Sequence, residues 1–368
     1  MKHIQKKEFF PHPDPVTDLY FKENGIFFDI ETTGFSPSSS IIYLIGCLRQ
    51  DDEHVIIDQF FAETKEDEKE LLLAFLELVK EKMTIITFNG VGFDIPFINA
   101  KCTAYGITDS LKNHRFVDIF KLISNIKFLL KLPNYKQKTI EAFLEIPRDD
   151  SFSGGELIAV YEEYLSSHSP ELEKLLLLHN FEDVTGMPAL LPVLSYTEIL
   201  NGAYTVEEAS IQPYTLYEGG MGQELVITLK NDYTVPKRVS HHCGDFYLTM
   251  IQDTTKIRVP VYEGTLKFFY PNYKDYYYLP KEDMAIHKSV ADFVDKEYKE
   301  KARAGNCYTK KDSMFLPQFD CLMTPVFRKE PKDKISYFEY TKDFIKSNEQ
   351  LSYYVAHIMR HFLSSKGR

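Results

Sequence analysis

The sequence predicts an α/β fold, a mixed sheet flanked by helices, joined to a second, mixed α+β domain that contains an antiparallel sheet. Up to residue 197, short apolar runs typical of buried strands alternate with patterns of helical period. Beyond residue 200, apolar and polar residues alternate with period two, as in strands with one buried face. The composition, 44% hydrophobic and 26% charged, is that of a folded globular protein.

The first domain is expected to begin with three consecutive strands, because turn-rich segments such as GFSPSSS separate three apolar runs. A helix follows, since apolar residues recur at helical spacing from Leu72 to Val79. The expected elements, in order, are strands at 26–31, 41–48 and 54–61, that helix, a strand at 83–88, a helix near 94–105, a strand around 114–118 and helices up to about residue 197.

Residues 1–20 carry three prolines within five positions and are expected to form an irregular lead-in. We therefore place a first domain at 21–198 and a C-terminal α+β domain at 199–368, whose role the sequence leaves open. The expected elements of the second domain are strands at 223–230, 245–252 and 255–262, a helix near 285–303 and a final helix from about 339 to 364.

The net charge of −11 is unevenly distributed. Residues 201–368 hold 24 Lys and Arg against 22 Asp and Glu, a net of +2, which leaves 19 against 32, a net of −13, for residues 1–200. An acidic first half has two interpretations. It is either a solvated acidic surface or an acidic site that binds divalent cations and so lets an anion approach.

No stretch is long and apolar enough to predict a membrane span, and the amino terminus lacks the apolar core of a signal peptide. Five cysteines, an odd number, are scattered along the chain, which favours reduced thiols over a disulfide framework. We therefore expect a cytoplasmic protein without membrane contact. The sequence does not indicate protein partners.

Two acidic residues stand in an otherwise apolar strand, IFFDIETTG at 26–34. Asp29 and Glu31 are two positions apart, so in a strand both side chains point to the same face. Two carboxylates this close repel each other unless a cation lies between them. The plainer alternative is a strand that emerges into solvent before the turn TTG.

Further acids occur at the start of one helix and in the middle of another. Asp94, in TFNGVGFDIPF at 87–97, follows the fourth strand and begins a helix, where Asp is also a common N-cap. His179 and Asp183 lie four residues apart on one face of a helix that starts after Ser169. This pair could satisfy itself by a hydrogen bond, whereas a buried carboxylate that meets further carboxylates requires a metal ion.

Together the four acids favour a site for divalent metal ions. Hard oxygen ligands without paired cysteines suit Mg²⁺ or Mn²⁺. Two such ions, about 3.5–4 Å apart, can stabilise both the attacking and the leaving oxygen of a phosphodiester. His179 is a candidate general base, because the ordinary pKa of histidine lies near neutrality. The pattern therefore predicts phosphodiester hydrolysis.

These stretches resemble the three motifs of the DEDD, or DnaQ-like, 3′–5′ exonucleases, whose fold is RNase H-like. FDIETTG is similar to the first motif, FNGVGFD to the second and HNFEDV to the third, so the resemblance covers about the first half of the chain. It implies an RNase H-like sheet and a substrate that is the 3′ end of single-stranded DNA or RNA. It implies two Mg²⁺ or Mn²⁺ ions bound by Asp29, Glu31, Asp94 and Asp183, and contacts of Thr32, Thr33 and Asn89 with the terminal nucleotide.

His179 departs from the pattern of this family. One subgroup has Tyr four residues before the last Asp and another has His five residues before it, whereas His179 stands four before Asp183. The subgroup and the exact role of His179 therefore stay open, and the resemblance implies a base or a residue that orients the attacking water. The nearest resemblance is to the YprB-like ribonuclease H-like domain proteins, which also carry Asn at the position of Asn180.

The second domain carries two weaker patterns. The stretch HHC at 241–243, with Cys307 and Cys321, would be an unusual zinc site, because its ligands are not paired as C-x-x-C. Six Lys and Arg between residues 296 and 311 lie near the tyrosine-rich stretch YPNYKDYYYLP. Such residues can bind a single strand by phosphate contact and base stacking, although a solvated helix face beside core tyrosines is the plainer interpretation.

The sequence thus predicts a metal-dependent, DEDD-type 3′–5′ exonuclease that releases 5′-mononucleotides from single-stranded DNA or RNA. The alternatives are an RNase H-like endonuclease and a nuclease-like scaffold that binds nucleic acid or protein without cutting it. Neither the choice between DNA and RNA nor the oligomeric state follows from the sequence.

Overall fold

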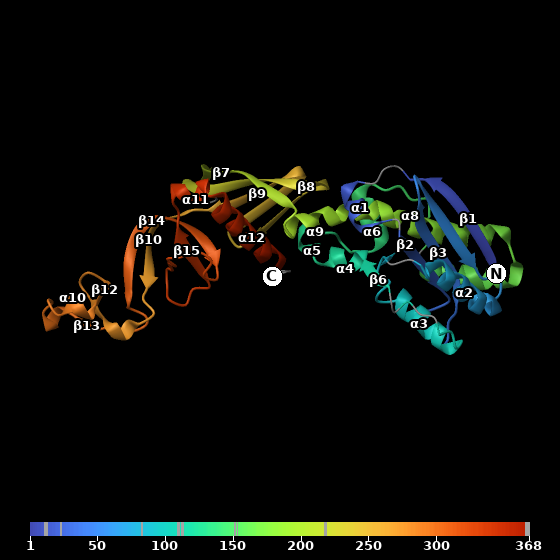
Figure 1. Ribbon diagram of the computed structural model, residues 1–368, viewed down its shortest axis with the longest axis horizontal. Helices are drawn as coiled ribbons and strands as arrows, with labels where there is room; N and C mark the ends of the chain where they lie inside the picture. The colour runs from blue at the N-terminus through green and yellow to red at the C-terminus, as the bar shows by residue number, and fades with distance from the viewer. Residues whose placement is uncertain are drawn as a thin grey trace. The chain divides into compact units, whose positions relative to one another are not determined.

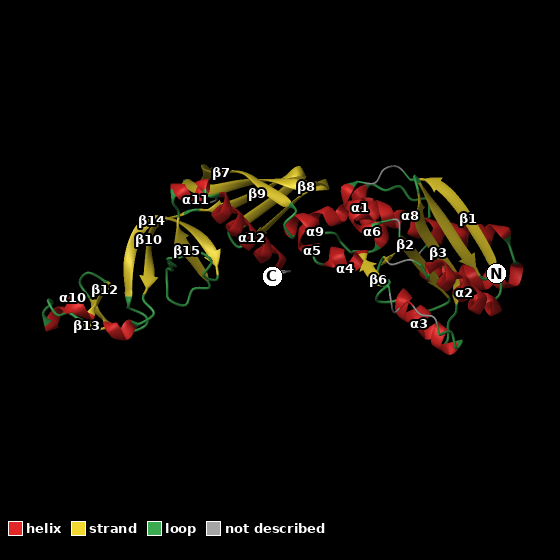
Figure 2. Ribbon diagram, viewed as in Figure 1, coloured by secondary structure: helices red, strands yellow, loops and turns green. Residues whose placement is uncertain are grey.

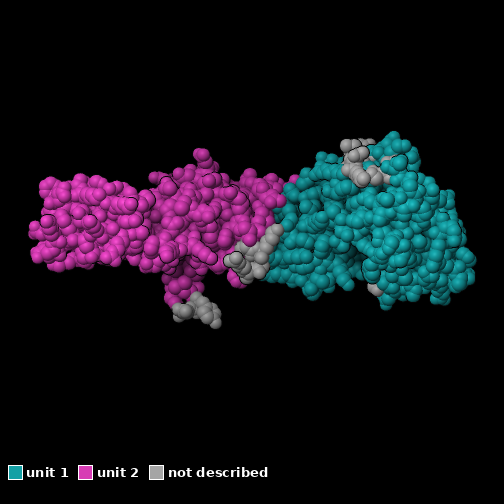
Figure 3. All heavy atoms as spheres, turned by 90° about the horizontal axis from the view of Figure 1, so that it is seen from below, with its two compact units in different colours: residues 1–198, 235–237 teal, residues 199–234, 238–368 magenta. Residues whose placement is uncertain are grey.

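The structure is a computed structural model. The chain divides into two compact units, one formed by Met1–Glu198 with Val235–Lys237 and the other by Ile199–Thr234 with Arg238–Arg368 (Figure 3). No helix in the described part of the chain is long and apolar enough to cross a membrane. The described residues are 1–10, 14–22, 24–81, 84–108, 111, 114–150, 152, 154–216 and 219–364.

The first unit is built on a six-stranded mixed sheet with the order β1-β4-β3-β2-β5-β6 (Figures 1 and 2). Neighbours among β1, β4, β3 and β2 pair antiparallel, whereas β2, β5 and β6 pair parallel. The strands are β1 Lys2–Phe9, β2 Gly25–Thr32, β3 Ile42–Asp51, β4 His54–Phe61, β5 Thr84–Thr87 and β6 Arg115–Asp118. The mixed sheet expected from the sequence is confirmed.

Two helices cover opposite faces of this sheet. Phe28 of β2 packs on Phe75 of α2, which spans Glu68–Val79, with ring centroids 5.0 Å apart. The next residue, Asp29, points to the other face, where Asn180 of α8, which spans Pro170–Leu190, donates a hydrogen bond to it. Alternation along one strand therefore places an apolar contact under α2 and a carboxylate under α8.

The helices expected between residues 94 and 197 are confirmed as a series of mostly short segments. Predicted and observed ends differ by small amounts, and Met83, the expected first residue of the fourth strand, lies outside the described residues. The remaining α-helices described in this unit are α1 Pro15–Tyr20, α3 Asp94–Ala104, α4 Ile119–Ser124, α5 Lys127–Leu130, α6 Gln137–Leu144, α7 Gly154–Ser167 and α9 Ser195–Leu200, the last of which runs into the second unit.

The prediction of an irregular lead-in at 1–20 is wrong. Residues 2–9 form β1, which pairs with β4 over its whole length. Pro15 begins α1 rather than interrupting it, and Asp14 accepts hydrogen bonds from the first turn as its N-cap. The segment KHIQKKEF has few apolar residues because β1 is a largely exposed edge strand, where lysines discourage pairing with other chains.

The second unit contains antiparallel sheets with the orders β7-β8-β9, β10-β14-β15 and β12-β11-β13. An antiparallel sheet in this half is therefore confirmed. The strands are β7 Tyr204–Thr215, β8 Met221–Cys243, β9 Phe246–Pro260, β10 Tyr262–Phe269, β11 Tyr276–Leu279, β12 Met284–His287, β13 Glu300–Lys301, β14 Tyr308–Phe319 and β15 Ile335–Glu339.

The helix expected near 285–303 is wrong. Residues 284–287 form β12 and pair with the tyrosine-rich β11, and the helical parts are short, α10 at Lys288–Ala291 and a single 3-10 turn at Lys296–Tyr298. Residues 300–301 pair with the other edge of β11, so sheet hydrogen bonds replace helical ones at both ends of the segment. The final helix is confirmed in two parts, α11 Lys342–Lys346 and α12 Asn348–Ser364.

Candidate active site

Four acids that the sequence singles out come from three elements of the first unit. Asp29 and Glu31 lie in β2, Asp94 is the first residue of α3, and Asp183 lies in α8. Asp94 is not the N-cap of its helix; its Oδ1 accepts a hydrogen bond of 3.2 Å from the backbone N–H of Ile30. This bond fixes the start of α3 against β2, next to the two carboxylates of that strand.

A close approach of α8 to the sheet brings Asp183 to this group. A Cβ atom on Gly46 of β3 would meet Oδ1 of Asn180 at 2.1 Å, so only glycine leaves room for the helix here. The buried Asn180 donates to Asp29 Oδ2 at 3.4 Å and accepts from Gln59 Nε2 at 3.0 Å. Gly46 and Gln59 thus position α8 over β2, although neither carries a catalytic group.

Burial raises the pKa of three of the acids. The pKa of Asp29 lies well above its usual value, because of burial first and then of the charges of Asp94, Asp183 and Glu31. Burial likewise raises the pKa of Glu31 to about 8, against the opposing effect of His179, and that of Asp94 to about 7, against the hydrogen bond from Ile30. The ionised forms of these three acids are therefore disfavoured unless a cation lies close to them.

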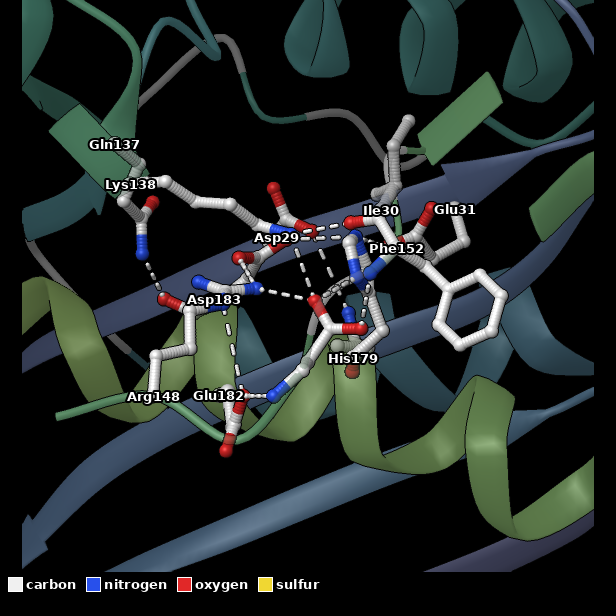
Figure 4. Close-up of polar contacts among 12 residues, drawn as sticks. Asp29, Ile30, Glu31, Gln137, Lys138, Arg148, Phe152, His179, Glu182 and Asp183 are labelled. Carbon is white, nitrogen blue, oxygen red and sulfur yellow. Dashed lines mark hydrogen bonds and ion pairs between the residues drawn. The ribbon is translucent and has the colours of Figure 1, made fainter. Parts of the chain in front are cut away.

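His179 contacts three carboxylates with its two ring nitrogens (Figure 4). Nδ1 lies 2.7 Å from Asp150, while Nε2 lies 3.2 Å from Asp183 and 3.5 Å from Glu31. Burial alone would lower the pKa of His179, but Asp183, Glu31 and Asp150 together raise it to about 9. In the metal-free protein the imidazole is therefore held as a cation between these carboxylates.

Arg148 is the second cation of the cluster, and sequence reasoning missed it. Its guanidinium lies 2.6 Å from Asp183, 3.1 Å from Asp150 and 3.2 Å from Glu141, and its side chain is only 9% exposed. Lys138 also pairs with Asp150, at 2.8 Å. Lys138 and Glu141 belong to α6, and Arg148 and Asp150 to the segment that follows it, IPRDD at 146–150. This segment has no periodic pattern that would identify it as part of a site.

The donor set fits Mg²⁺ or Mn²⁺. One ligand atom each from Glu31, His179 and Asp183 lie within 4.8 Å of one another, and Asp29 and Asp94 are close enough for their charges to interact. The carboxylate oxygens suit hard divalent ions, and the His179 imidazole lies beside them. Within the described residues no other group of three His, Cys, Asp or Glu converges in this way, so Cys307, Cys321 and the HHC stretch do not form a zinc site there.

The residues expected to contact the terminal nucleotide lie at two turns. Thr32 donates its hydroxyl to the carbonyl of Gly34 at 2.9 Å, and Thr33 accepts from the N–H of Ile41 at 3.0 Å, so both stabilise the turn after β2. Asn89 has a left-handed backbone with φ of 66° and an exposed side chain. Its side chain is therefore available to a ligand.

The basic cluster expected between residues 296 and 311 is partly neutralised within the second unit. Lys310 pairs with Asp283 at 2.8 Å and Lys311 with Glu339 at 2.6 Å. Tyr278 also donates its hydroxyl to Asp283, at 2.5 Å. These pairs favour the plainer interpretation of the cluster, and binding of a nucleic-acid strand here stays a prediction.

Asp150→Asn is expected to lower the pKa of His179 from about 9 toward its ordinary value of 6.5, because one of its three carboxylates becomes neutral. Since the folded-state pKa is the higher one, the charged imidazole contributes stability that is complete below pH 6.5 and lost as pH rises through 9. The stability lost in Asp150→Asn should therefore be larger below pH 6.5 than above pH 9, on top of a pH-independent loss from the pairs with Arg148 and Lys138.

An NMR titration of the His179 imidazole in EDTA, with urea unfolding at both ends of this range, measures these effects. The matched control is Asp149→Asn, since the neighbouring Asp149 is exposed and should leave the titration unchanged. An unchanged pKa of His179 in Asp150→Asn would contradict the assignment of Asp150 as its partner.

The topology and the acidic cluster define an RNase H-like domain. Residues 26–195 match the family model of the RNase_H superfamily, which confirms the RNase H-like fold expected for the first half. This fold and this match support a nuclease activity in general terms. The likeness to the YprB-like subgroup stays a prediction.

Solved structures with a partial likeness include a family B DNA polymerase from the hyperthermophilic archaeon Pyrobaculum calidifontis, with 14% identity over 68% of this chain and 35% of that one, at a TM-score of 0.38. An ExoI/SSB-Ct complex matches with 13% identity over 56% and 55%, at a TM-score of 0.29. A zinc-bound E. coli ExoI–ssDNA complex matches with 14% identity over 56% and 54%, at 0.28.

This chain thus spans between 35% and 55% of the length of those proteins. No curated protein matches the chain.

Proposed function

We propose that the first unit is a 3′–5′ exonuclease that hydrolyses single-stranded DNA or RNA with two Mg²⁺ or Mn²⁺ ions and releases 5′-mononucleotides. The observation that carries this proposal is the convergence of Asp29, Glu31, Asp94 and Asp183 in a largely buried site. Buried carboxylates that only stabilise a fold are normally paired one to one with cations. Here Glu31 and Asp183 contact His179, and Asp183 also contacts Arg148. Asp29 and Asp94 form no ion pair among the described residues although they lie beside these acids, an excess of negative charge that favours divalent cations.

Asp29, Glu31, Asp94 and Asp183 would hold the two ions, Asp94 either directly or through water. When bound, such ions supply the positive charge that stabilises the attacking and leaving oxygens of a phosphodiester. The protein contributes rigidity to this site. Asn180 holds Asp29 and the N–H of Ile30 holds Asp94, so the carboxylates keep their positions.

His179 is the residue we propose to accept the proton of the attacking water. Asp150 binds Nδ1, which leaves Nε2 facing Glu31 and Asp183. Its pKa of about 9 depends on those carboxylates, so cations bound to them would lower that pKa toward the range of a base at neutral pH. Thr32, Thr33 and Asn89, at the two turns described above, are proposed to contact the terminal nucleotide.

The test follows hydrolysis of single-stranded DNA and RNA labelled at either end, with Mg²⁺, Mn²⁺ or EDTA. The proposal expects a ladder of single-nucleotide steps from the 5′-labelled strand and early release of a labelled mononucleotide from the 3′-labelled strand. Both products should be lost in EDTA and in Asp29→Asn. Internal cuts would support an endonuclease instead, and the absence of cleavage under every condition would support a scaffold that does not cut.

A further inference from the structure

A cavity of about 390 Å³ opens in the first unit beside the acidic cluster. It has a mainly apolar wall with a few polar groups, the lining typical of a site for a flat organic ligand. The rings of Phe88, Phe120 and Tyr135 supply the apolar wall, and the other lining residues are Asn89, Lys127, Lys136 and Gln137.

This aromatic pocket adjoins the acidic cluster at two places. Asn89 belongs to the turn that leads into α3, whose first residue is Asp94. Gln137, shown beside Asp183 in Figure 4, donates its Nε2 to the backbone carbonyl of Asp183 at 2.8 Å. A chain bound at the carboxylates therefore reaches the pocket within a short distance.

The faces of two rings in the pocket lie against the same ammonium group. The ammonium of Lys127 lies 4.7 Å from the ring centroid of Phe120 and 4.8 Å from that of Tyr135. The Tyr135 hydroxyl donates to the carbonyl of Lys127 at 2.9 Å and accepts from the N–H of Leu132 at 3.2 Å, so this ring is held in place before any ligand binds. A position that attracts a cation to two ring faces also accepts another flat ring.

The charge of the pocket is suited to phosphate. Among the described residues, neither Lys127 nor Lys136 forms an ion pair with a carboxylate, whereas Lys138 in the next turn is bound to Asp150. Lys127 lies beside two aromatic rings and Lys136 lines the same pocket, so two lysines without a carboxylate partner face a ligand bound there. Cations next to ring faces are the combination that proteins use to bind single strands.

We propose that this aromatic pocket binds a base near the 3′ end of single-stranded nucleic acid by stacking on Tyr135 or Phe120, while Lys127 and Lys136 contact the backbone phosphates. The base displaces the Lys127 ammonium from the rings toward the phosphate. Because every base has a stacking face, this contact favours single strands over duplexes but selects no particular base. The inference rests on the proposed function, which supplies the reason for a 3′ end at the carboxylates.

The test compares Tyr135→Leu with Tyr135→Phe. Both variants lose the hydroxyl that holds the loop, but only Tyr135→Phe keeps the ring. Binding of a fluorescent oligothymidylate is measured by anisotropy in the Asp29→Asn background with Mn²⁺, so that hydrolysis does not interfere. The same strand is then used with an abasic residue at each position near its 3′ end in turn.

Tyr135→Leu is expected to weaken binding by about 5-fold or more, and Tyr135→Phe by much less, since stacking on the ring is lost only in the first. At one position, the abasic residue should weaken binding to the Tyr135→Phe protein but cause no further loss in Tyr135→Leu. Lys127→Ala should reduce the salt dependence of binding. Tyr353→Ala and Lys69→Ala, which remove an exposed ring and an exposed lysine elsewhere, should bind as the parent does.

If each abasic residue reduced the affinity of Tyr135→Leu and Tyr135→Phe equally, the inference would be overturned. Such a result would mean that no base stacks on the ring and that Tyr135 has only a structural role. The outcomes also separate this inference from the proposed function. Hydrolysis from the 3′ end without this dependence on Tyr135 would reject the aromatic pocket alone. If binding depends on Tyr135 and on one base in this way but no hydrolysis occurs, the aromatic pocket is supported and the exonuclease proposal is rejected.

Discussion

Asp29→Asn is expected to reduce metal-dependent hydrolysis by about 1000-fold or more, because a ligand of the ions contributes several kcal/mol to the stabilisation of the transition state. The same change should stabilise the metal-free protein. The pKa of Asp29 is raised well above its usual value by burial and by Asp94, Asp183 and Glu31, so its ionised form opposes folding. The neutral amide keeps the shape and can still accept the hydrogen bond from Asn180.

Because the pKa of Asp29 is raised in the folded state, the stabilisation by Asp29→Asn depends on pH. A carboxyl whose folded-state pKa is raised supports folding while it is protonated and opposes it progressively as pH rises. The gain from Asp29→Asn should therefore be smaller at pH 5 than at pH 8, because more of the Asp29 carboxyl is forced to ionise at the higher pH. Urea unfolding in EDTA at the two pH values measures the gain, and the labelled-strand assay measures hydrolysis.

A matched control exists in the same sheet. Asp58 is 1% exposed and thus at least as buried as the acids of the site, but it is paired with Arg49 at 3.2 Å and with His3 at 2.8 Å. Asp58→Asn should therefore destabilise the protein at both pH values. If Asp29→Asn also destabilised it, or left hydrolysis intact, Asp29 would be an ordinary structural carboxylate rather than a metal ligand.

Arg148→Met is expected to lower the free energy of unfolding of the metal-free protein by about 3–5 kcal/mol, because Glu141 loses its ion-pair partner and Asp150 and Asp183 each lose one of theirs. Mn²⁺ should restore a large part of this loss. One oxygen of Asp183 is bound by Arg148 at 2.6 Å and becomes free for the metal in the variant. A ligand that binds only the folded state stabilises it in proportion to its affinity, so Mn²⁺ should stabilise the variant more than the wild type.

The measurement is urea unfolding with and without Mn²⁺, together with the Mn²⁺ affinity by titration calorimetry. Arg49→Met is the control, since it also removes an arginine from a buried carboxylate, but Asp58 keeps His3 and Gln5 as partners. Its loss should be smaller and should not depend on Mn²⁺. An equal effect of Mn²⁺ on Arg148→Met and the wild type would show that the guanidinium does not compete with metal for Asp183.

Local patterns suffice for the part of the site that lies in regular elements. The spacing of Asp29 and Glu31 in a strand, and of His179 and Asp183 in a helix, determines which side chains share a face. The position of Asp94 depends on a hydrogen bond to Ile30, 64 residues away in the sequence, and only the motif order indicated it in advance. For the two pairs in regular elements, Asp29 with Glu31 and His179 with Asp183, the period of the strand or helix alone predicts that the side chains lie together.

The rest depends on packing between distant segments. Arg148 and Asp150 follow α6 in an irregular segment, and they reach His179 and Asp183 only because that segment lies against α8. The strand β1 lacks an apolar alternation because an edge strand buries little of its surface, so its pairing with β4 left no signal in its own residues. Likewise, the segment at 284–287 became a strand through its partner β11 rather than through its own propensity.

The contact at Gly46 has a consequence for the energetics of catalysis. Asn180 approaches the backbone of β3 so closely that no side chain separates the helix from the sheet. Contacts with backbone atoms vary less than contacts between flexible side chains, so the two halves of the carboxylate site are held at one separation in the folded protein. If the proposed hydrolysis takes place here, little reorganisation of the site is needed when charge develops on a bound phosphate, and the absence of a side chain at Gly46 makes this possible.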